Sequence, residues 1–419
     1  MKTGINTFLI IFIFGIILNG QTTNLKKEAV ELGKQGNYLR AIEILEKAKL
    51  ENPNDPEVYY YLGYFTHYLE YDSRPLIGYN IEYSNKVLDY FYKAIELKPD
   101  YGDAYYFIGA EYGARALKAL QDEDIESCKL SYKKSFESKA FPDWLIEYGK
   151  NILKSCDNNG ILFVGGDAEF NPIKYLQIIE KYREDVTVIP FGLLNRPWFV
   201  EKLRIGVEGL IKPLPLSLTK EQIFDMHPYK WDTLTIEIPI SEKLKKEFEL
   251  PKNELMKWRI YPNLETDGKS FLDASRAVLM NIVETNNWER AIYFSLGCNP
   301  SFFSGLNEYL QLNGINYKVL PFNLKGTKYE INSDNISEIL LNENNVKYFN
   351  DVTIHNMPRV SKILINYYVV LYKLALYYKV QNQIDRIIKL TEFVNKNLQT
   401  DIFPQSKNII KEIEELANK

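Results

Sequence analysis

The chain has 419 residues, a formal net charge of −4 and 46% hydrophobic residues. This length and hydrophobic content suffice for two or three domains, each with its own core. No block of lysine and arginine stands out, so the composition argues against a nucleic-acid partner, whose phosphates are bound by clustered basic side chains.

Residues 1–20 have the features of an export signal. Lys2 precedes an apolar run from Phe8 to Leu18, which ends at Asn19-Gly20-Gln21. This run is shorter than the roughly 20 residues that cross a bilayer, so we predict a cleaved secretory signal and a periplasmic or secreted protein. An uncleaved N-terminal anchor is the alternative.

Residues 22–156 carry three irregular copies of a helix-hairpin pattern. The second and third copies begin near Pro56 and Tyr105 and are longer than the first, and a helix over Pro142 to Lys154 would close the stack. The first copy has small and turn residues where two antiparallel helices approach closely, namely Ala29, Gly36, Asn37, Tyr38, Ala41, Leu45, Ala48 and Pro53. Because this spacing resembles that of the tetratricopeptide repeat, we predict TPR-like helical repeats.

The resemblance to this repeat implies a concave groove lined by the first helix of each repeat. In that register, four side chains would face the groove: Tyr60, Tyr64, His67 and Tyr106. An aromatic groove suits an extended peptide or a helix, so we expect a protein or peptide partner there. The alternative is that these tyrosines only pack between repeats, in a chain with 31 tyrosines.

Residues 157–325 are predicted to form a Rossmann-like α/β domain with a parallel sheet. Ile161–Val164 and Val186–Ile189 are continuous apolar runs, each followed by an amphipathic helical segment. Parallel strands covered by helices on both faces carry such runs. Ile292–Phe294 and Tyr317–Pro321 repeat the pattern around a predicted helix, so we expect at least four parallel strands in one sheet.

Two turns of this domain end in Asn-Pro, at Asn171-Pro172 and at Asn299-Pro300. Asparagine caps exposed helix amides and proline fits the first helical position, so a helix is expected to begin at each. Thr233–Ile238 alternates and is predicted to be an antiparallel or edge strand. The three cysteines do not make a disulfide framework, although a Cys156–Cys298 bridge stays open.

Residues 326–419 are predicted to be a polar linker followed by a helical tail. The helices are expected over Met357–Lys379, Asn382–Asn397 and Pro404–Asn418. Their apolar residues recur at helical spacing, which indicates packed rather than solvent-exposed helices.

Short motifs in residues 157–400 point to a family. They are, in chain order, Gly166-Asp167, Pro172, Tyr175-Leu176-Gln177, Asp185-Val186, Leu193-Leu194-Asn195, Trp198, Pro213-Leu214-Pro215, Asn286-Asn287-Trp288, Arg290 and Ile292-Tyr293-Phe294. This region resembles the soluble C-terminal portion of a bacterial multi-pass membrane family described as protein O-mannosyltransferase-like, largely of unknown function. That family's presumed sugar-transfer chemistry belongs to its membrane-embedded half, which has no counterpart here, so a glycosyltransferase activity is not carried over.

The carboxyl ends of the predicted strands are the expected place for a ligand. Six residues would converge there: Asp167, Glu169, Asn195, Arg196, Trp198 and Asn299. Helix N-termini and Arg196 would favour a phosphate or carboxylate. Alternatively, Asp167 accepts amides in its own turn, Asn171 and Asn299 are caps and Trp198 belongs to the core.

No dinucleotide fingerprint, phosphate-cradling loop, nucleophile elbow or metal-binding histidine pair occurs in the sequence, so no cofactor or metal is predicted. We therefore expect an exported, periplasmic, non-enzymatic interaction or scaffold protein that binds a protein partner, with a cell-envelope membrane protein as one candidate. The alternative is a glycan- or phosphosugar-related enzyme or binding domain with its site at the strand ends. A single cavity shared by Asp167, Asn195 and Asn299 would favour that alternative.

Overall fold

The computed structural model describes residues 24–70, 80–354, 356–398 and 403–418. The predicted export signal, residues 1–20, lies outside the described residues, as does most of the extra length in the second predicted repeat. Among the residues that are described, no helix combines the length and apolarity needed to cross a bilayer.

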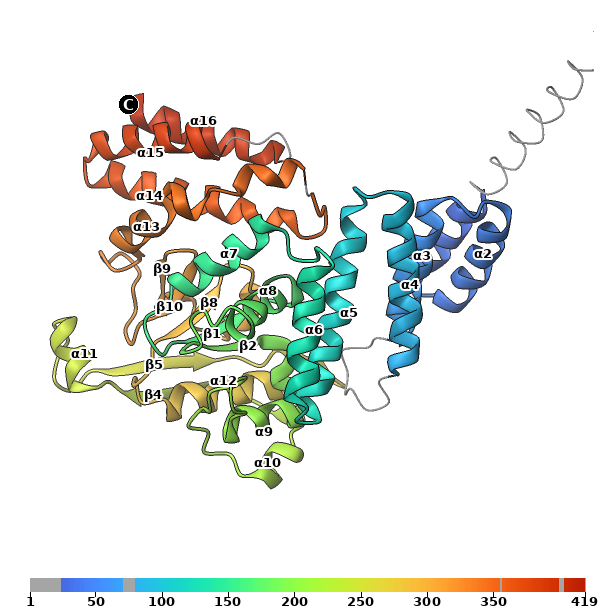
Figure 1. Ribbon diagram of the computed structural model, residues 1–419. Coiled ribbons are helices and arrows are strands. Elements are labelled where there is room, and N and C mark those ends of the chain that lie inside the picture. Colours follow the sequence, from blue (N-terminus) through green and yellow to red (C-terminus); the bar gives the residue numbers. More distant parts are fainter. Residues whose placement is uncertain (1–23, 71–79, 355, 399–402, 419) are drawn as a thin grey trace, which may run out of the picture.

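The N-terminal region consists of helical hairpins, as predicted (Figure 1). Its helices are residues 24–34, α2 (Tyr38–Glu51), α3 (Pro56–Glu70), α4 (Ile81–Leu97), α5 (Gly102–Gln121), α6 (Ile125–Glu137) and α7 (Asp143–Lys154). Small residues lie where helices cross: Ala41, Ala48 and Ala94 are fully buried. Large aromatic side chains fill the space between hairpins, with the rings of Phe91 and Phe107 stacked at 5.3 Å.

One contact recurs between successive hairpins. The Tyr59 hydroxyl donates to the carbonyl of Pro53 at 3.1 Å, and the Tyr105 hydroxyl donates to the carbonyl of Pro99 at 2.9 Å. In each case the tyrosine on the first helix of a hairpin ties down the loop that precedes that helix. This repetition fits the internal periodicity seen in the sequence.

The centre of the molecule is a six-stranded mixed sheet in the order β11-β9-β10-β8-β1-β2. The strands are β1 (Ile161–Val164), β2 (Thr187–Pro190), β8 (Ile292–Ser295), β9 (Leu310–Asn313), β10 (Asn316–Val319) and β11 (Ile331–Asn332). β1 pairs in parallel with β2 on one side and with β8 on the other. All three are buried along their length, which confirms the parallel strands inferred from their continuous apolar runs.

The expectation of at least four parallel strands in one sheet is confirmed, because β1, β2, β8, β9 and β11 run in the same direction. The predicted fourth strand, however, is the exception, because β10 runs antiparallel to both β8 and β9. The predicted intervening helix is replaced by 3₁₀ turns, η2 (Pro300–Phe303) and η3 (Asn307–Tyr309), and by β9. Ser304 and Gly305, at φ 51° and 89°, end the helical turn. The chain then returns as a tight hairpin through Gly314 rather than as a crossover.

The two Asn-Pro turns behave differently. Asn299 caps η2 by accepting from the Ser301 amide at 2.9 Å, as expected, and Pro300 opens the turn. At the other turn the prediction is wrong, because α8 (Asp167–Ile178) already begins at Asp167 with Gly166 as its N-cap. Pro172 therefore lies inside the helix, where its missing amide removes one backbone hydrogen bond.

Further elements surround the sheet. The helices are α9 (Pro197–Ile205), α10 (Lys220–Phe224), α11 (Glu242–Glu247) and α12 (Ala274–Thr285), and the outer strands are β3 (Tyr229–Lys230), β4 (Leu234–Pro239), β5 (Leu255–Ile260), β6 (Leu264–Thr266) and β7 (Lys269–Leu272). β4 pairs antiparallel with β5, as the alternation of its sequence predicted. The remaining short 3₁₀ helices are η1 (Phe191–Asn195), η4 (Glu343–Asn345), η5 (Phe349–Thr353) and η6 (Ser361–Leu364).

The C-terminal helices pack beside α7 in Figure 1 and follow the predicted order. They are α13 (Ser333–Leu340), α14 (Ile365–Val380), α15 (Ile384–Asn397) and α16 (Pro404–Asn418). The sheet continues past residue 325, because β11 pairs with β9. Cys128, Cys156 and Cys298 are all free and buried, so the Cys156–Cys298 bridge is not formed.

Candidate functional site

The turns after β1 and β8 meet at the carboxyl end of the sheet and fill the space between the two strands. This is the switch point, because the chain leaves β1 toward β2 and later returns on the other side as β8. A Cβ on Gly165 would lie 2.2 Å from the carbonyl oxygen of Gly297. The backbones are therefore in direct contact where an open sheet usually leaves a crevice.

Hydrogen bonds of Glu169 stabilise this contact between the two turns. Its carboxylate accepts from the Gly165 amide at 3.1 Å, from the Ser295 hydroxyl and from the Tyr148 hydroxyl at 3.3 Å. The side chain is buried, and burial raises the pKa of its carboxyl. Glu169 thus joins α8, β8 and α7, and its hydrogen-bonding capacity is used within the protein.

The two asparagines predicted at the site also have structural partners. Asn195 accepts from the Ser275 amide at 2.9 Å and so helps to cap the start of α12. Asn299 caps η2 through the Ser301 amide. Each side chain thus stabilises the start of a helix, which was expected for Asn299 and not for Asn195.

Arg196 and Trp198 lie at the start of α9. Arg196 is its half-buried N-cap residue, and the ring of half-buried Trp198 lies edge-to-face against that of Phe199 at 5.5 Å. Both residues belong to the packing of η1 and α9.

Asp167 differs from the other five predicted residues. It is the first residue of α8, and within the described part of the chain no group donates a hydrogen bond to its carboxylate. Burial raises the pKa of this carboxyl, and the charge of nearby His67 acts in the opposite direction. Burial raises the pKa of Tyr106 on α5, and the charge of Asp167 raises it further. Asp167 therefore faces the helical hairpins.

His67 belongs to a buried polar chain that joins three helices. Its Nδ1 lies 2.5 Å from Oε1 of Glu111, and the Ser84 hydroxyl donates to Oε2 of Glu111 at 2.6 Å. Nε of Arg115 in turn donates to the Ser84 hydroxyl at 3.0 Å. Because His67 and Glu111 are both buried, this chain fixes the relative positions of α3, α4 and α5.

The tyrosines predicted to line a groove lie on α3 and α5. Tyr60 is only 5% exposed and packs on Tyr101 at 4.8 Å, so it is mainly a packing residue. Tyr64 and Tyr106 are half-buried, and both rings lie edge-to-face against Phe107. We use the name aromatic groove for the cluster of Tyr60, Tyr64, Tyr106, Phe107 and Asp103, in which Tyr60 and Phe107 are buried.

A side chain from the far end of the sequence occupies this groove. The guanidinium of Arg359 lies 4.7 Å from the ring centre of Tyr64 and 5.3 Å from that of Phe107. Its Nε donates to the Tyr60 hydroxyl at 3.4 Å, and its backbone amide donates to Oδ1 of Asp103 at 3.0 Å. Arg359 thus connects the C-terminal region to the hairpins.

The structure therefore brings His67, Tyr106 and Asp167 together, although the sequence placed them in two separate sites. Sequence reasoning missed Glu111, Asp103 and Arg359. Glu111 carried a usable signal, because it is a lone carboxylate within an otherwise apolar stretch of helix. Arg359 carried none, since it follows a proline in a polar segment with no recognisable pattern.

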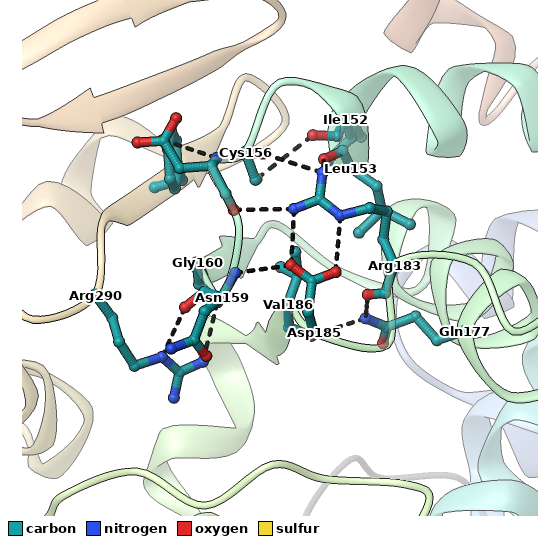
Figure 2. Close-up of polar contacts among 12 residues, drawn as sticks. Ile152, Leu153, Cys156, Asn159, Gly160, Gln177, Arg183, Asp185, Val186 and Arg290 are labelled. Atoms are coloured by element: carbon teal, nitrogen blue, oxygen red, sulfur yellow. Dashed lines mark hydrogen bonds and ion pairs between the residues drawn. The ribbon is translucent and has the colours of Figure 1, made fainter.

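Several of the motif residues noted in the sequence form a network at the opposite, amino end of the strands (Figure 2). The Arg290 guanidinium donates to the carbonyls of Asn159 and Gly160 at 2.8 and 3.1 Å. Asp185 accepts from the Asn159 amide at 2.7 Å, and the Gln177 amide group donates to the carbonyl of Val186 at 2.7 Å. These motif residues hold β1, β2 and β8 in register.

Two further cavities lie elsewhere. One of about 990 Å³ lies between β9, β11 and α14, with Lys373 and Tyr377 on its wall. The other, of about 530 Å³, lies beside β2 and includes Lys174, whose pKa is lowered to about 8 by burial. None of the predicted site residues lines either cavity.

The comparison with known families concerns the middle of the chain. The family model described as TMEM260-associated domain 2 matches residues 145–258 and, in a second and overlapping match, residues 224–337. No tetratricopeptide family matches, so the repeat type of the N-terminal hairpins stays a prediction. No curated protein matches the chain. β1 and β2 fall in the first match and β8 to β11 in the second, so the region similar to TMEM260-associated domain 2 contains the whole six-stranded sheet.

Proposed function

We propose that the protein is an exported, periplasmic, non-enzymatic interaction protein. Its N-terminal hairpins act as tetratricopeptide-type repeats and bind a protein partner through the aromatic groove. The observation that carries this proposal is the position of the Arg359 guanidinium over the rings of Tyr64 and Phe107. A groove that holds a side chain from a segment more than 250 residues away along the chain has the shape and chemistry to hold one from another protein.

The sheet domain supports a binding role over a catalytic one. The switch point is filled by the contact between Gly165 and Gly297 and by the hydrogen bonds of Glu169. Asn195 and Asn299 serve as caps. Of the three residues whose convergence would favour an enzyme, only Asp167 keeps a polar side chain that is not used as a cap.

The resemblance to the O-mannosyltransferase-like membrane family and the match to TMEM260-associated domain 2 suggest a kind of partner. In that family the α/β portion accompanies a membrane-embedded half. A separate membrane protein of the cell envelope is therefore the partner we favour.

This proposal is tested by crosslinking the tagged full-length protein in cells and identifying bound proteins by mass spectrometry. Tyr64→Ala should remove the specific partner, because it deletes one wall of the groove. Tyr261→Ala, at an exposed tyrosine on the loop after β5, is the matched control and should retain the partner. An identical set of partners for wild type and Tyr64→Ala would contradict the proposal. Cell fractionation of the same cultures tests the periplasmic location.

A second candidate function, binding of a glycan or phosphosugar, rests on Asp167. A half-buried carboxylate without a hydrogen-bond donor in the described residues is suited to accept hydrogen bonds from the hydroxyl groups of a sugar. Thermal-shift measurements with neutral and phosphorylated sugars test it: stabilisation of the wild type that is lost in Asp167→Asn supports this candidate. Stabilisation by no sugar, or equal stabilisation of both proteins, removes it.

A further inference from the structure

We propose that the aromatic groove recognises the guanidinium of an arginine on the partner protein, and that Arg359 of this chain occupies the same position until the partner's arginine replaces it. This inference rests on the proposed function and specifies the chemistry of the partner.

The contacts of Arg359 define what the groove selects. Its planar guanidinium lies over two aromatic rings, Tyr64 and Phe107, at 4.7 and 5.3 Å. A flat, weakly hydrated cation gains more from such stacking than a compact ammonium does. The hydrogen bond from Nε to the Tyr60 hydroxyl also orients the plane of the guanidinium. A lysine ammonium is not planar and could not both stack on the rings and donate in this plane.

The charges around the groove also call for a cation. Nε of Arg359 lies 3.7 Å from Oδ2 of Asp103, whose side chain is 21% exposed. If the Arg359 side chain rotated away, aromatic faces and the Asp103 carboxylate would remain, which is the composition of a site that binds organic cations.

Arg359 is held in a way that permits exchange of its side chain. Met357 and Val360 on either side are 3% and 1% exposed, so they anchor the backbone of this segment. The side chain of Arg359, in contrast, is 41% exposed. Rotation of this one side chain into solvent therefore opens the groove while the surrounding segment stays packed.

The test measures binding of a short peptide, acetyl-Gly-Arg-Gly-amide, to the full-length protein by calorimetry. Arg359→Ala removes the internal competitor, so the affinity of this variant for the peptide should exceed that of the wild type by at least tenfold. The same peptide with citrulline, which keeps the shape but not the charge, should not bind. Lys362→Ala, which changes an exposed cation three residues away, should behave as the wild type does.

A second measurement keeps the inference testable if the isolated peptide binds too weakly for calorimetry. Guanidinium chloride at low millimolar concentration should raise the Tm of Arg359→Ala but not that of the wild type, because the ion refills the vacated position. Adding Tyr64→Ala to the Arg359→Ala variant should abolish both the peptide binding and this rescue.

Three results would overturn the inference: equal peptide affinity for wild type and Arg359→Ala, equal binding of the arginine and citrulline peptides, or equal binding of a lysine peptide. If these occur while Tyr64→Ala still loses the partner in cells, the arginine assignment is wrong and the proposed function stands. If the arginine peptide binds as expected while Tyr64→Ala retains every partner in cells, the proposed function is wrong and the groove's selectivity stands.

Discussion

At the scale of single residues, Arg290 shows how one buried cation organises the amino end of the sheet. Its guanidinium donates to the carbonyls of Asn159, Gly160 and Pro213 and to the hydroxyl of Thr187, while burial lowers its pKa to about 10. These acceptors come from three separate segments, and no shorter or non-planar cation reaches all of them.

Arg290→Lys should therefore lower the free energy of unfolding by about 2 to 3 kcal/mol, because buried carbonyls lose their donors. Denaturant unfolding followed by circular dichroism checks this prediction. Arg259→Lys, at an exposed arginine, is the matched control and should change the stability by less than about 0.5 kcal/mol. Equal stability of the two variants would contradict the role given to Arg290.

Glu147 makes stability depend on pH near neutrality. The carboxylate accepts from the Tyr348 amide at 3.2 Å, yet burial raises its pKa to about 7. The folded protein thus holds this proton more tightly than the unfolded chain, whose glutamates titrate near 4.3. The free energy of unfolding contributed by this group should fall as the pH rises from about 4.5 to about 7.

Glu147→Gln keeps an acceptor for Tyr348 and removes the buried charge. The free energy of unfolding of the variant, minus that of the wild type, should be about 2 kcal/mol larger at pH 8 than at pH 5. Denaturant unfolding at both pH values measures this difference. Parallel pH profiles for the two proteins would show that folding does not raise the pKa of Glu147.

At the scale of elements, the contact between the turns after β1 and β8 depends on glycine. An added Cβ at Gly165 would meet the backbone of Gly297 at 2.2 Å, whereas one at the adjacent Gly166 would meet nothing within 4 Å. Gly165→Ala should destabilise the protein by about 2 kcal/mol or more, because two backbones must separate. Gly166→Ala, the matched control, should stay within about 1 kcal/mol of wild type. Thermal unfolding of both variants measures the difference.

The parallel core of the sheet was predictable because its strands are buried on both faces. β1, β2 and β8 are short, continuous apolar runs, and such runs predict parallel strands that are buried on both faces. The β9–β10 hairpin also carried a signal that the prediction did not use, Asn313-Gly314 between apolar runs, which favours a tight turn. The start of α8 was misplaced because Pro172 is tolerated inside a helix held by its neighbours.

The candidate site was less predictable than the fold. The sequence singled out His67, Tyr64 and Asp167 as candidates, since polar and aromatic residues stand out at helix faces and strand ends. It could not bring them together, because their proximity depends on how α5 packs against α3 and α8. Arg359 reaches the groove only through the path of the C-terminal segment, which no local pattern encodes.

At the scale of the whole molecule, the predicted division at residue 156 does not separate two cores. One continuous hydrophobic cluster runs from Tyr60 in α3 through the sheet to Ile413 in α16. Across the predicted division, Phe136 of α6 stacks on Tyr175 of α8 at 4.6 Å. A second cluster contains only the first hairpin and the parts of α3 and α4 that pack on it.

A fragment of residues 157–419 should therefore fail to unfold cooperatively, because it exposes the apolar surface that α5, α6 and α7 normally cover. A fragment of residues 56–419, which lacks only the first hairpin, is the control and should retain a cooperative transition. Thermal unfolding followed by circular dichroism distinguishes the two. A sharp transition for residues 157–419 would show that the sheet domain is autonomous.

The contact between Arg359 and α5 also sets an order of events during synthesis. Asp103 and its hydrogen-bonded partner are 256 residues apart, so α3 and α5 leave the ribosome long before Arg359 is made. Each newly made chain thus passes through a stage in which the hairpins have emerged and their own arginine has not. A partner already present at that stage would meet a vacant groove, without any competition from within the chain.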